Sequence, residues 1–396
     1  MVKRMAKRVV TKAAPAPEET RDRLTRMQVV ANRFNAWRPA AAVLTRVRAV
    51  PTRFVQIDHA TRVGGWPIER FTTLHGPSNH GKTLLAHGLG LSFLEQGHFY
   101  AFVDAEFTTP EDWLATLMGQ HVTHPGFVAL RPKTFEETVD AVRQFVEQIA
   151  EAREKGEVDP DTSAIVVVDS MTKLVPDRLM KRIAKDGAVG KRGSVDGYGG
   201  RGGQLRAALN KQWLDELVPL LYHTRSSLVA ITREGDDPDA DDFDRMKDKG
   251  WKIQGGKALT YDASLVVRVS RDSWLRESSE KEARVVGERH RLRIWKTKIG
   301  GKDGEHTDAF VHTSNGVLSP EGFDRARDVL ELAIAAGVVE QAGAWLRWNG
   351  NRWNGEAKAL AKLRDRGLLA DLEREVRALD VPKGTPHEEV PSPAPA

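Results

Sequence analysis

One glycine-bounded segment has the composition of a phosphate-binding loop. Residues 76–83 read Gly-Pro-Ser-Asn-His-Gly-Lys-Thr and fit the pattern G-x-x-x-x-G-K-[ST]. Glycines let the backbone turn tightly enough to point successive N–H groups at phosphate oxygens. The Lys should reach the β- and γ-phosphates, and the Thr hydroxyl should ligate Mg²⁺. The segment therefore predicts binding of ATP and Mg²⁺ through Gly76, Pro77, Ser78, Asn79, His80, Gly81, Lys82 and Thr83.

Two carboxylates follow apolar runs that read as buried strands. Asp169 ends the run at 164–168, where a carboxylate can hold the magnesium shell, although an Asp there is also a common helix cap. Glu106 follows the run at 99–103 and is a candidate general base for the attacking water; a solvated loop glutamate is the alternative. Because the carboxyl ends of parallel strands meet at one sheet edge, both should lie beside residues 76–83.

The elements that must position these residues alternate between short apolar runs and longer helical stretches. The apolar runs occupy 71–74, 99–103, 128–130, 164–168, 227–231, 264–269 and 292–295. This pattern predicts an α/β fold with a mainly parallel, doubly wound sheet. We expect a basic tail at 1–17, an N-terminal helix and strand at 18–50, a core at 51–319, a small helix-rich domain at 320–380 and a tail at 381–396.

Composition excludes several classes of site. The chain has 396 residues and no cysteine, which excludes disulfides, thiolate metal sites and a cysteine nucleophile. No apolar run approaches the roughly 18–20 residues of a membrane span, so we expect no membrane partner and a cytoplasmic location. The net charge of +5 permits a polyanionic partner without requiring one. The basic tail is either solvated or an auxiliary contact to DNA phosphates.

Four segments resemble, in order and spacing, motifs of the bacterial and phage RecA recombinase family. They are 102–106 (Phe-Val-Asp-Ala-Glu), 166–170 (Val-Val-Val-Asp-Ser), 255–264 (Gly-Gly-Lys-Ala-Leu-Thr-Tyr-Asp-Ala-Ser) and 296–299 (Lys-Thr-Lys-Ile). The segment from Val339 to Trp345 is similar to the family's small C-terminal domain. The resemblance covers about residues 18–380. It implies a RecA-type P-loop NTPase core, a small α/β C-terminal domain and an N-terminal helix that packs onto the adjacent subunit.

The resemblance also implies roles for single residues. Trp113 stands where the family has an aromatic residue that stacks on adenine, and a core tryptophan is the alternative. Lys296 and Lys298 match the family's cations that reach the ATP of a neighbouring subunit; spacing alone would make them two solvent-facing lysines. Arg233 stands where the family normally has a glutamine that couples the ATP and DNA sites.

Two segments match the family's DNA-binding loops in position. Residues 181–203 are rich in glycine and basic residues, and a flexible basic surface loop is the alternative. Residues 235–254 begin with an acidic stretch that should repel phosphate, so only the second half is a candidate. The candidate DNA-binding residues are Lys181, Arg182, Lys185, Lys191, Arg192, Tyr198, Arg201, Arg245, Lys247 and Lys249.

The family match implies a DNA-dependent ATPase of homologous recombination. Such a protein forms helical filaments on single-stranded DNA and exchanges strands with homologous duplex DNA. The acidic stretch and Arg233 keep open a regulatory ATP-binding switch that acts on a protein partner. A ring-forming, helicase-like motor is a third possibility, which the match in the C-terminal domain disfavours.

Overall fold

The computed structural model describes Arg26 and residues 47–185, 199–237, 239–241, 250–277, 282–300, 307–314, 322–365 and 367–379. The chain divides into two compact units, Met1–Arg46 and Val47–Ala396, and the elements below belong to the second. The expected tails at 1–17 and 381–396 lie outside the described residues. So does the expected N-terminal helix, apart from Arg26.

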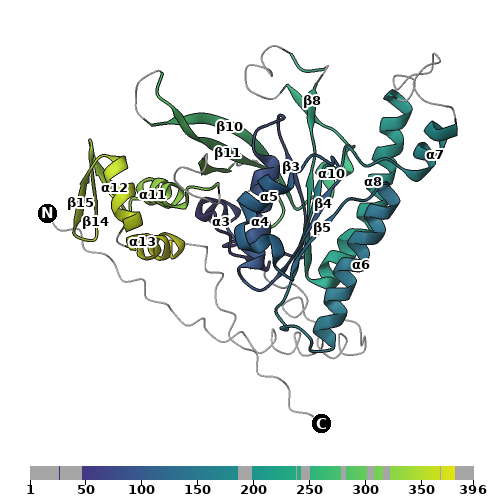
Figure 1. The fold of residues 1–396 in the computed structure, drawn as a ribbon, viewed down its shortest axis with the longest axis horizontal. Helices are drawn as coiled ribbons and strands as arrows, with labels where there is room; N and C mark the ends of the chain where they lie inside the picture. Colours follow the sequence, from purple (N-terminus) through teal and green to yellow (C-terminus); the bar gives the residue numbers. More distant parts are fainter. Residues whose placement is uncertain are drawn as a thin grey trace, which may run out of the picture. The chain divides into compact units, whose positions relative to one another are not determined.

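An eight-stranded sheet forms the centre of the described part of the second unit (Figure 1). Its strands are β3 (Phe71–His75), β4 (Phe99–Asp104), β5 (Phe127–Leu130), β6 (Ala164–Asp169), β7 (Ser226–Ile231), β10 (Leu265–Arg276), β11 (Val285–Thr297) and β12 (Thr307–Ser314). The order is β12-β11-β10-β3-β7-β6-β4-β5. From β10 to β5 all neighbours run parallel, whereas β11 and β12 are antiparallel. The predicted mainly parallel α/β sheet is confirmed.

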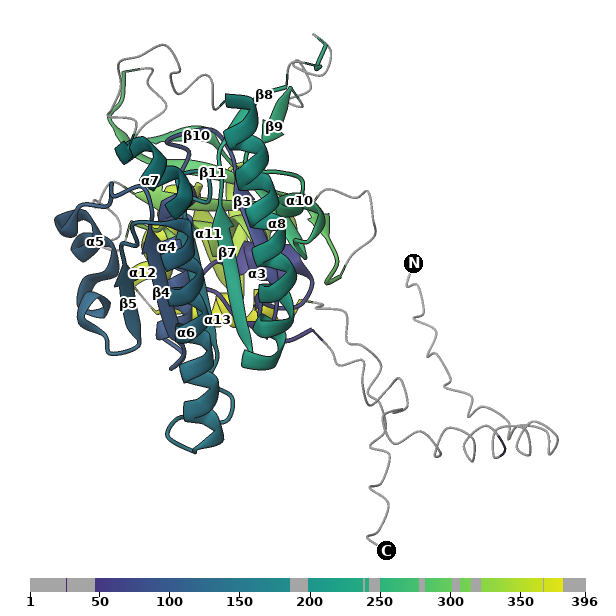
Figure 2. The same cartoon turned by 90° about the vertical axis from the view of Figure 1, so that its right-hand side faces the viewer.

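Helices cover both faces of this sheet. They are α4 (Lys82–Leu94), α5 (Glu111–Met118) and the 3₁₀ turn η1 (Gly119–Thr123), and, across the sheet, α6 (Phe135–Glu154) and α8 (Gly199–Thr224). Side chains of β4 alternate between the two layers, as the two-residue period of a strand requires. Tyr100 and Phe102 are buried in a cluster with α4, whereas Ala101 and Val103 are buried with α6 and α8. Figure 2 looks onto the face that α6 and α8 cover.

Short elements surround the carboxyl edge of the parallel strands. They are α7 (Asp177–Lys185) and a two-stranded hairpin of β8 (Glu234–Asp236) and β9 (Trp251–Ile253). The short helix α10 (Ala258–Tyr261) precedes β10 and packs on α8. The hairpin begins where β7 ends, so it follows directly from a core strand. Because β3, β4, β6 and β7 are parallel, their carboxyl ends lie at one edge, next to these elements.

The C-terminal segment packs on an element from the start of the unit. Its elements are α11 (Arg325–Ala335), β13 (Glu340–Ala342), β14 (Trp345–Trp348), β15 (Asn351–Asn354), α12 (Glu356–Asp365) and α13 (Leu368–Arg377); the earlier ones are β1 (Ala49–Val50), α3 (Val55–Thr61) and β2 (Trp66–Pro67). Val55 of α3 is buried in the same cluster as Trp348, Trp353 and Leu372. No helix within the described ranges is long and apolar enough to cross a membrane.

Three sequence expectations differ from the structure in detail. β10 and β11 extend well beyond the apolar runs that predicted them, because their outer halves carry alternating charged residues. β12 was not predicted, since its sequence mixes polar and apolar residues. The expected loop at 181–203 is bounded by helix, because α7 continues to Lys185 and α8 begins at Gly199 despite its glycines.

Candidate active site

The predicted phosphate loop joins β3 to the N-terminus of α4. Gly76 and Gly81 have φ angles of +148° and +87°, which non-glycine residues rarely adopt. A Cβ at Gly76 would lie 2.0 Å from the carbonyl oxygen of Val269 in β10. The loop therefore requires glycine at both ends, and it leads directly into the positive end of a helix dipole.

Lys82 and Thr83 are the first two residues of α4, and their side chains contact different groups. The Lys82 Nζ donates to the carbonyl oxygens of Gly76 at 2.9 Å and Pro77 at 2.7 Å. Burial lowers its pKa from the ordinary value, and nearby carboxylates oppose that shift. The ammonium group of Lys82 thus lies against the backbone of the phosphate loop, from where it can reorient to phosphate oxygens.

Asp169 lies at the carboxyl end of β6 and meets Thr83. The Thr83 Oγ1 donates to Asp169 Oδ2 at 2.5 Å. Burial raises the pKa of Asp169 to about 6, against the hydrogen bond from Thr83, which lowers it. A hydroxyl and a carboxylate held this close are the oxygen ligands that Mg²⁺ prefers, so the pair fits the metal that the sequence predicts.

Glu106 follows β4 and receives hydrogen bonds from two side chains. Ser170 Oγ donates to its Oε1 at 2.7 Å, and Arg233 Nη2 contacts Oε1 and Oε2 at 3.0 and 2.9 Å. Burial raises the pKa of Glu106, but these hydrogen bonds outweigh that effect and the pKa lies below its ordinary value. Glu106 is therefore ionised at neutral pH, as a general base must be.

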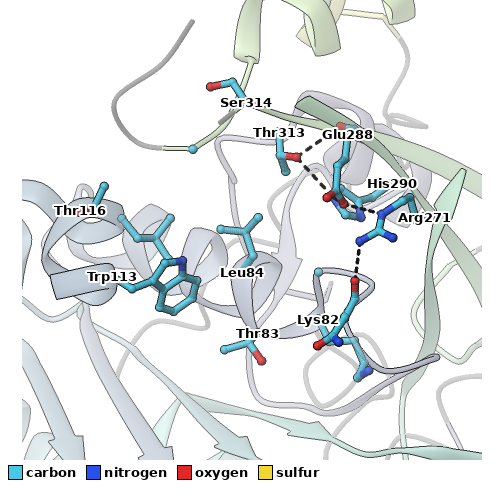
Figure 3. A pocket seen from close by; sticks show the side chains of 14 residues that line it. Lys82, Thr83, Leu84, Trp113, Thr116, Arg271, Glu288, His290, Thr313 and Ser314 are labelled. Atoms are coloured by element: carbon cyan, nitrogen blue, oxygen red, sulfur yellow. Dashed lines mark hydrogen bonds and ion pairs between the residues drawn. The ribbon is translucent and has the colours of Figure 1, made fainter. Parts of the chain in front are cut away.

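A pocket of about 520 Å³ opens beside the loop (Figure 3). Trp113 of α5 lies on one side of it and Arg271 on the other. Trp113 is 37% exposed, so it is not a core residue. The space between an indole face and the phosphate loop suits a flat heteroaromatic base. The lining residues are Asn79, Gly81, Lys82, Thr83, Leu84, Trp113, Thr116, Leu117, Arg271, Glu288, His290, Thr313, Ser314 and Gly322.

Sequence reasoning missed three lining residues: Arg271 and His290, which contact the phosphate loop, and Glu288, which pairs with Arg271. The backbone N–H of Arg271 in β10 donates to His80 Nδ1 at 2.9 Å, and its Nη2 donates to Asn79 O at 2.8 Å. His290 of β11 contacts His80 O through Nδ1 at 3.0 Å. Glu288 pairs with Arg271 at 2.7 Å. The only signal in the sequence was the spacing of 288 and 290, which puts both on one strand face.

The chain is similar to known RecA proteins. The RecA N-terminal domain matches residues 39–201. Protein RecA of Chlorobaculum parvum is 26% identical over 349 residues, covering 88% of this chain and 87% of its own. Protein RecA of Kineococcus radiotolerans is 25% identical, covering 84% and 83%. The chain is thus similar to RecA proteins over most of its length, at low identity. A crystal structure of the RadB recombinase is also similar, with 18% identity and a TM-score of 0.40 over 67% of this chain and 94% of that one.

Lys296 and Lys298 are not among the residues that line this pocket. Lys296 Nζ donates to the carbonyl oxygens of Thr260 at 2.6 Å and Tyr261 at 2.8 Å, and Lys298 Nζ donates to that of Tyr261 at 2.8 Å. Both ammonium groups gather at the carboxyl end of α10, and Tyr261 itself is 63% exposed. Their expected role, contact with the ATP of a neighbouring subunit, stays a prediction.

Most of the candidate DNA-binding residues fall outside what the structure describes. Lys191, Arg192, Tyr198, Arg245, Lys247 and Lys249 lie outside the described residues, and Arg182, Lys185 and Arg201 are described only in their backbone. Lys181 on α7 has a side chain 74% exposed, in an ion pair with Asp177 at 2.5 Å. In the hairpin, Lys252 contacts Asp237 at 2.8 Å and Asp239 at 3.1 Å, so the acidic stretch engages this cation itself.

Proposed function

We propose that this chain is a RecA-like recombinase that hydrolyses ATP when bound to single-stranded DNA. It would form a helical filament on that DNA and exchange strands with homologous duplex DNA. The observation that carries the proposal is the convergence of Lys82, Thr83, Asp169 and Glu106, from β3–α4, β6 and β4, at one edge of the sheet. Similarity to RecA proteins over most of the chain supports the recombinase assignment.

Each residue has a separate task in this proposal. The backbone of Gly76–Gly81 and the start of α4 bind the triphosphate, and Lys82 turns from the loop carbonyls to its oxygens. Thr83 and Asp169 would hold Mg²⁺, which when bound neutralises charge on the β- and γ-phosphates. Trp113 stacks on the base. Glu106 accepts the proton of the water that attacks the γ-phosphorus.

Two variants test the ATP site. Lys82→Ala should abolish turnover, because it removes the cation aimed at the β- and γ-phosphates. Glu106→Gln should still bind ATP yet hydrolyse it about 10²- to 10⁴-fold more slowly, the usual contribution of a general base. Steady-state ATP hydrolysis and calorimetric ATP binding give the two readouts. Lys155→Ala is the control, because Lys155 is an exposed residue that directly follows α6. Normal turnover in either site variant would contradict the assignment.

The regulatory switch remains the second candidate because of one observation. Lys252, a cation of the second predicted DNA loop, is paired with Asp237 and Asp239 in the free chain. If that hairpin does not bind DNA, the ATP site would serve a protein partner instead.

Strand exchange on homologous DNA, together with electron microscopy of the ATP–DNA complex, separates the candidates. Joint molecules and helical filaments are the expected result. Closed rings would favour the helicase-like motor. The absence of both filaments and joint molecules, with ATP hydrolysis intact, would favour the regulatory switch.

A further inference from the structure

The ion pair between Arg233 and Glu106 engages the group that the proposed reaction needs free. One guanidinium nitrogen, Nη2, contacts both carboxylate oxygens, at 2.9 and 3.0 Å, and Ser170 Oγ donates to Oε1 as well. A general base must present a carboxylate oxygen to the water. In this arrangement both oxygens of Glu106 already accept hydrogen bonds from protein groups.

The pair is placed where it can be broken. The Arg233 side chain is 40% exposed and that of Glu106 is 19% exposed. Ion pairs with this much contact with water are weak, so a modest displacement of the backbone at residue 233 suffices to separate them. A buried pair would instead behave as a fixed part of the core.

The backbone of Arg233 is attached to the β8–β9 hairpin. The N–H of Gln254 donates to Arg233 O at 3.0 Å, and Thr232 Oγ1 donates to Gln254 O at 2.6 Å. The next residue, Glu234, begins β8 and pairs with Ile253 of β9. A shift of the hairpin therefore moves Arg233, while Glu106 stays with β4, a different strand of the central sheet.

We propose that Arg233 restrains Glu106 and keeps ATP hydrolysis slow until the β8–β9 hairpin moves on binding DNA. The inference rests on the proposed function of Glu106 as general base. With the pair intact, both oxygens of Glu106 accept hydrogen bonds from protein groups instead of from the attacking water. Once Arg233 withdraws, Glu106 takes a proton from water as the water oxygen bonds to the γ-phosphorus. The bond from that phosphorus to the β,γ-bridging oxygen breaks, and ADP leaves with inorganic phosphate as the other product.

The first test needs no nucleotide. Urea unfolding of the wild type, Arg233→Gln, Glu106→Gln and the double variant forms a double-mutant cycle. The two substitutions should be coupled by about fivefold in the unfolding equilibrium constant, the size expected of a partly exposed ion pair. Additive effects would overturn the proposal, because they would show that the pair does not form in solution.

The second test measures turnover with and without single-stranded DNA. Arg233→Gln should raise the DNA-independent kcat about fivefold and leave the DNA-stimulated kcat unchanged, since the restraint is already released there. Arg233→Lys, which keeps the positive charge, should raise the DNA-independent kcat less. Arg143→Gln, which breaks a more exposed arginine–glutamate pair between α6 and α8, should leave both kcat values unchanged. In Arg233→Gln/Glu106→Gln the gain should vanish, because it acts through Glu106.

A lower or unchanged basal kcat in Arg233→Gln would overturn the proposal and make Arg233 a residue that orients Glu106 or serves only the fold. This failure is distinct from failure of the proposed function. The latter would appear in the wild type itself, as absent ATP hydrolysis or as hydrolysis that Glu106→Gln leaves intact.

Discussion

The pKa values of carboxylates in this protein shift in opposite directions because their surroundings differ. Glu106 receives hydrogen bonds from Ser170 and Arg233, and its pKa is lowered. Asp328 of α11 is 1% exposed, and its Oδ1 accepts bonds from the backbone N–H of His312 at 2.8 Å and from His312 Nδ1 at 2.7 Å. Its Oδ2 has no hydrogen-bond partner among the described residues. Burial raises the pKa of Asp328 to about 6, although the bond from His312 opposes the shift.

Asp328 should make stability depend on pH in a defined window. Its pKa rises from 3.8 to about 6 on folding, so the folded chain binds an extra proton between those values. The free energy of unfolding should therefore fall as pH rises from about 4 to 6, by about 1–3 kcal/mol from this group. Asp328→Asn should remove that component. Urea unfolding of both proteins at several pH values checks it, and parallel pH curves would contradict it.

At the scale of elements, charged contacts join the C-terminal helices to the start of the unit. Arg377 of α13 pairs with Asp58 of α3 at 2.5 Å and donates to Thr52 O at 2.7 Å. Asp58 is 4% exposed and also accepts from the backbone N–H and the hydroxyl of Thr52. The contact joins residues far apart in sequence, so it couples the C-terminal segment to the core.

Removing this contact should destabilise the protein. Arg377→Ala leaves the buried Asp58 carboxylate without its cation, which should cost about 2–3 kcal/mol, below the value for a fully buried pair because Arg377 is partly exposed. Arg374→Ala, three residues earlier on the same helix, removes an arginine 76% exposed and should cost less than about 0.5 kcal/mol. Urea unfolding of both variants compares them, and equal losses would show that the α3–α13 contact contributes little.

At the scale of the whole molecule, the parts of the fold and site that could be predicted were those with a local sequence pattern. The apolar runs predicted the central strands, because a strand buried on both faces is apolar throughout. The loop at 76–83 is recognisable because its glycines are a backbone requirement. Apart from the spacing of Glu288 and His290, nothing in the local sequence marks the residues that support the loop. Arg271 and His290 reach it only through pairing of β10 with β3 and β11. The Arg233–Glu106 pair likewise depends on strand order.

Binding to a polyanion is also a property of the whole chain, because the predicted cations are spread over separate segments. If residues 181–203 contact DNA phosphates, replacing Lys181, Lys191 and Arg192 with Gln should weaken binding to single-stranded DNA. The slope of log affinity against log salt should flatten by about 0.7 per lost contact. Fluorescence anisotropy at several salt concentrations measures it. An unchanged slope would remove this segment from the DNA path.

The bracing of the phosphate loop has a consequence for biosynthesis. His80 and Arg271 are 191 positions apart in the sequence, and His80 and His290 are 210 apart. A nascent chain that has emerged only as far as residue 260 already contains the complete loop motif, Asp169 and Glu106, but neither of these supports. The phosphate loop therefore gains the contacts from Arg271 and His290 late in translation, after most of the chain has left the ribosome.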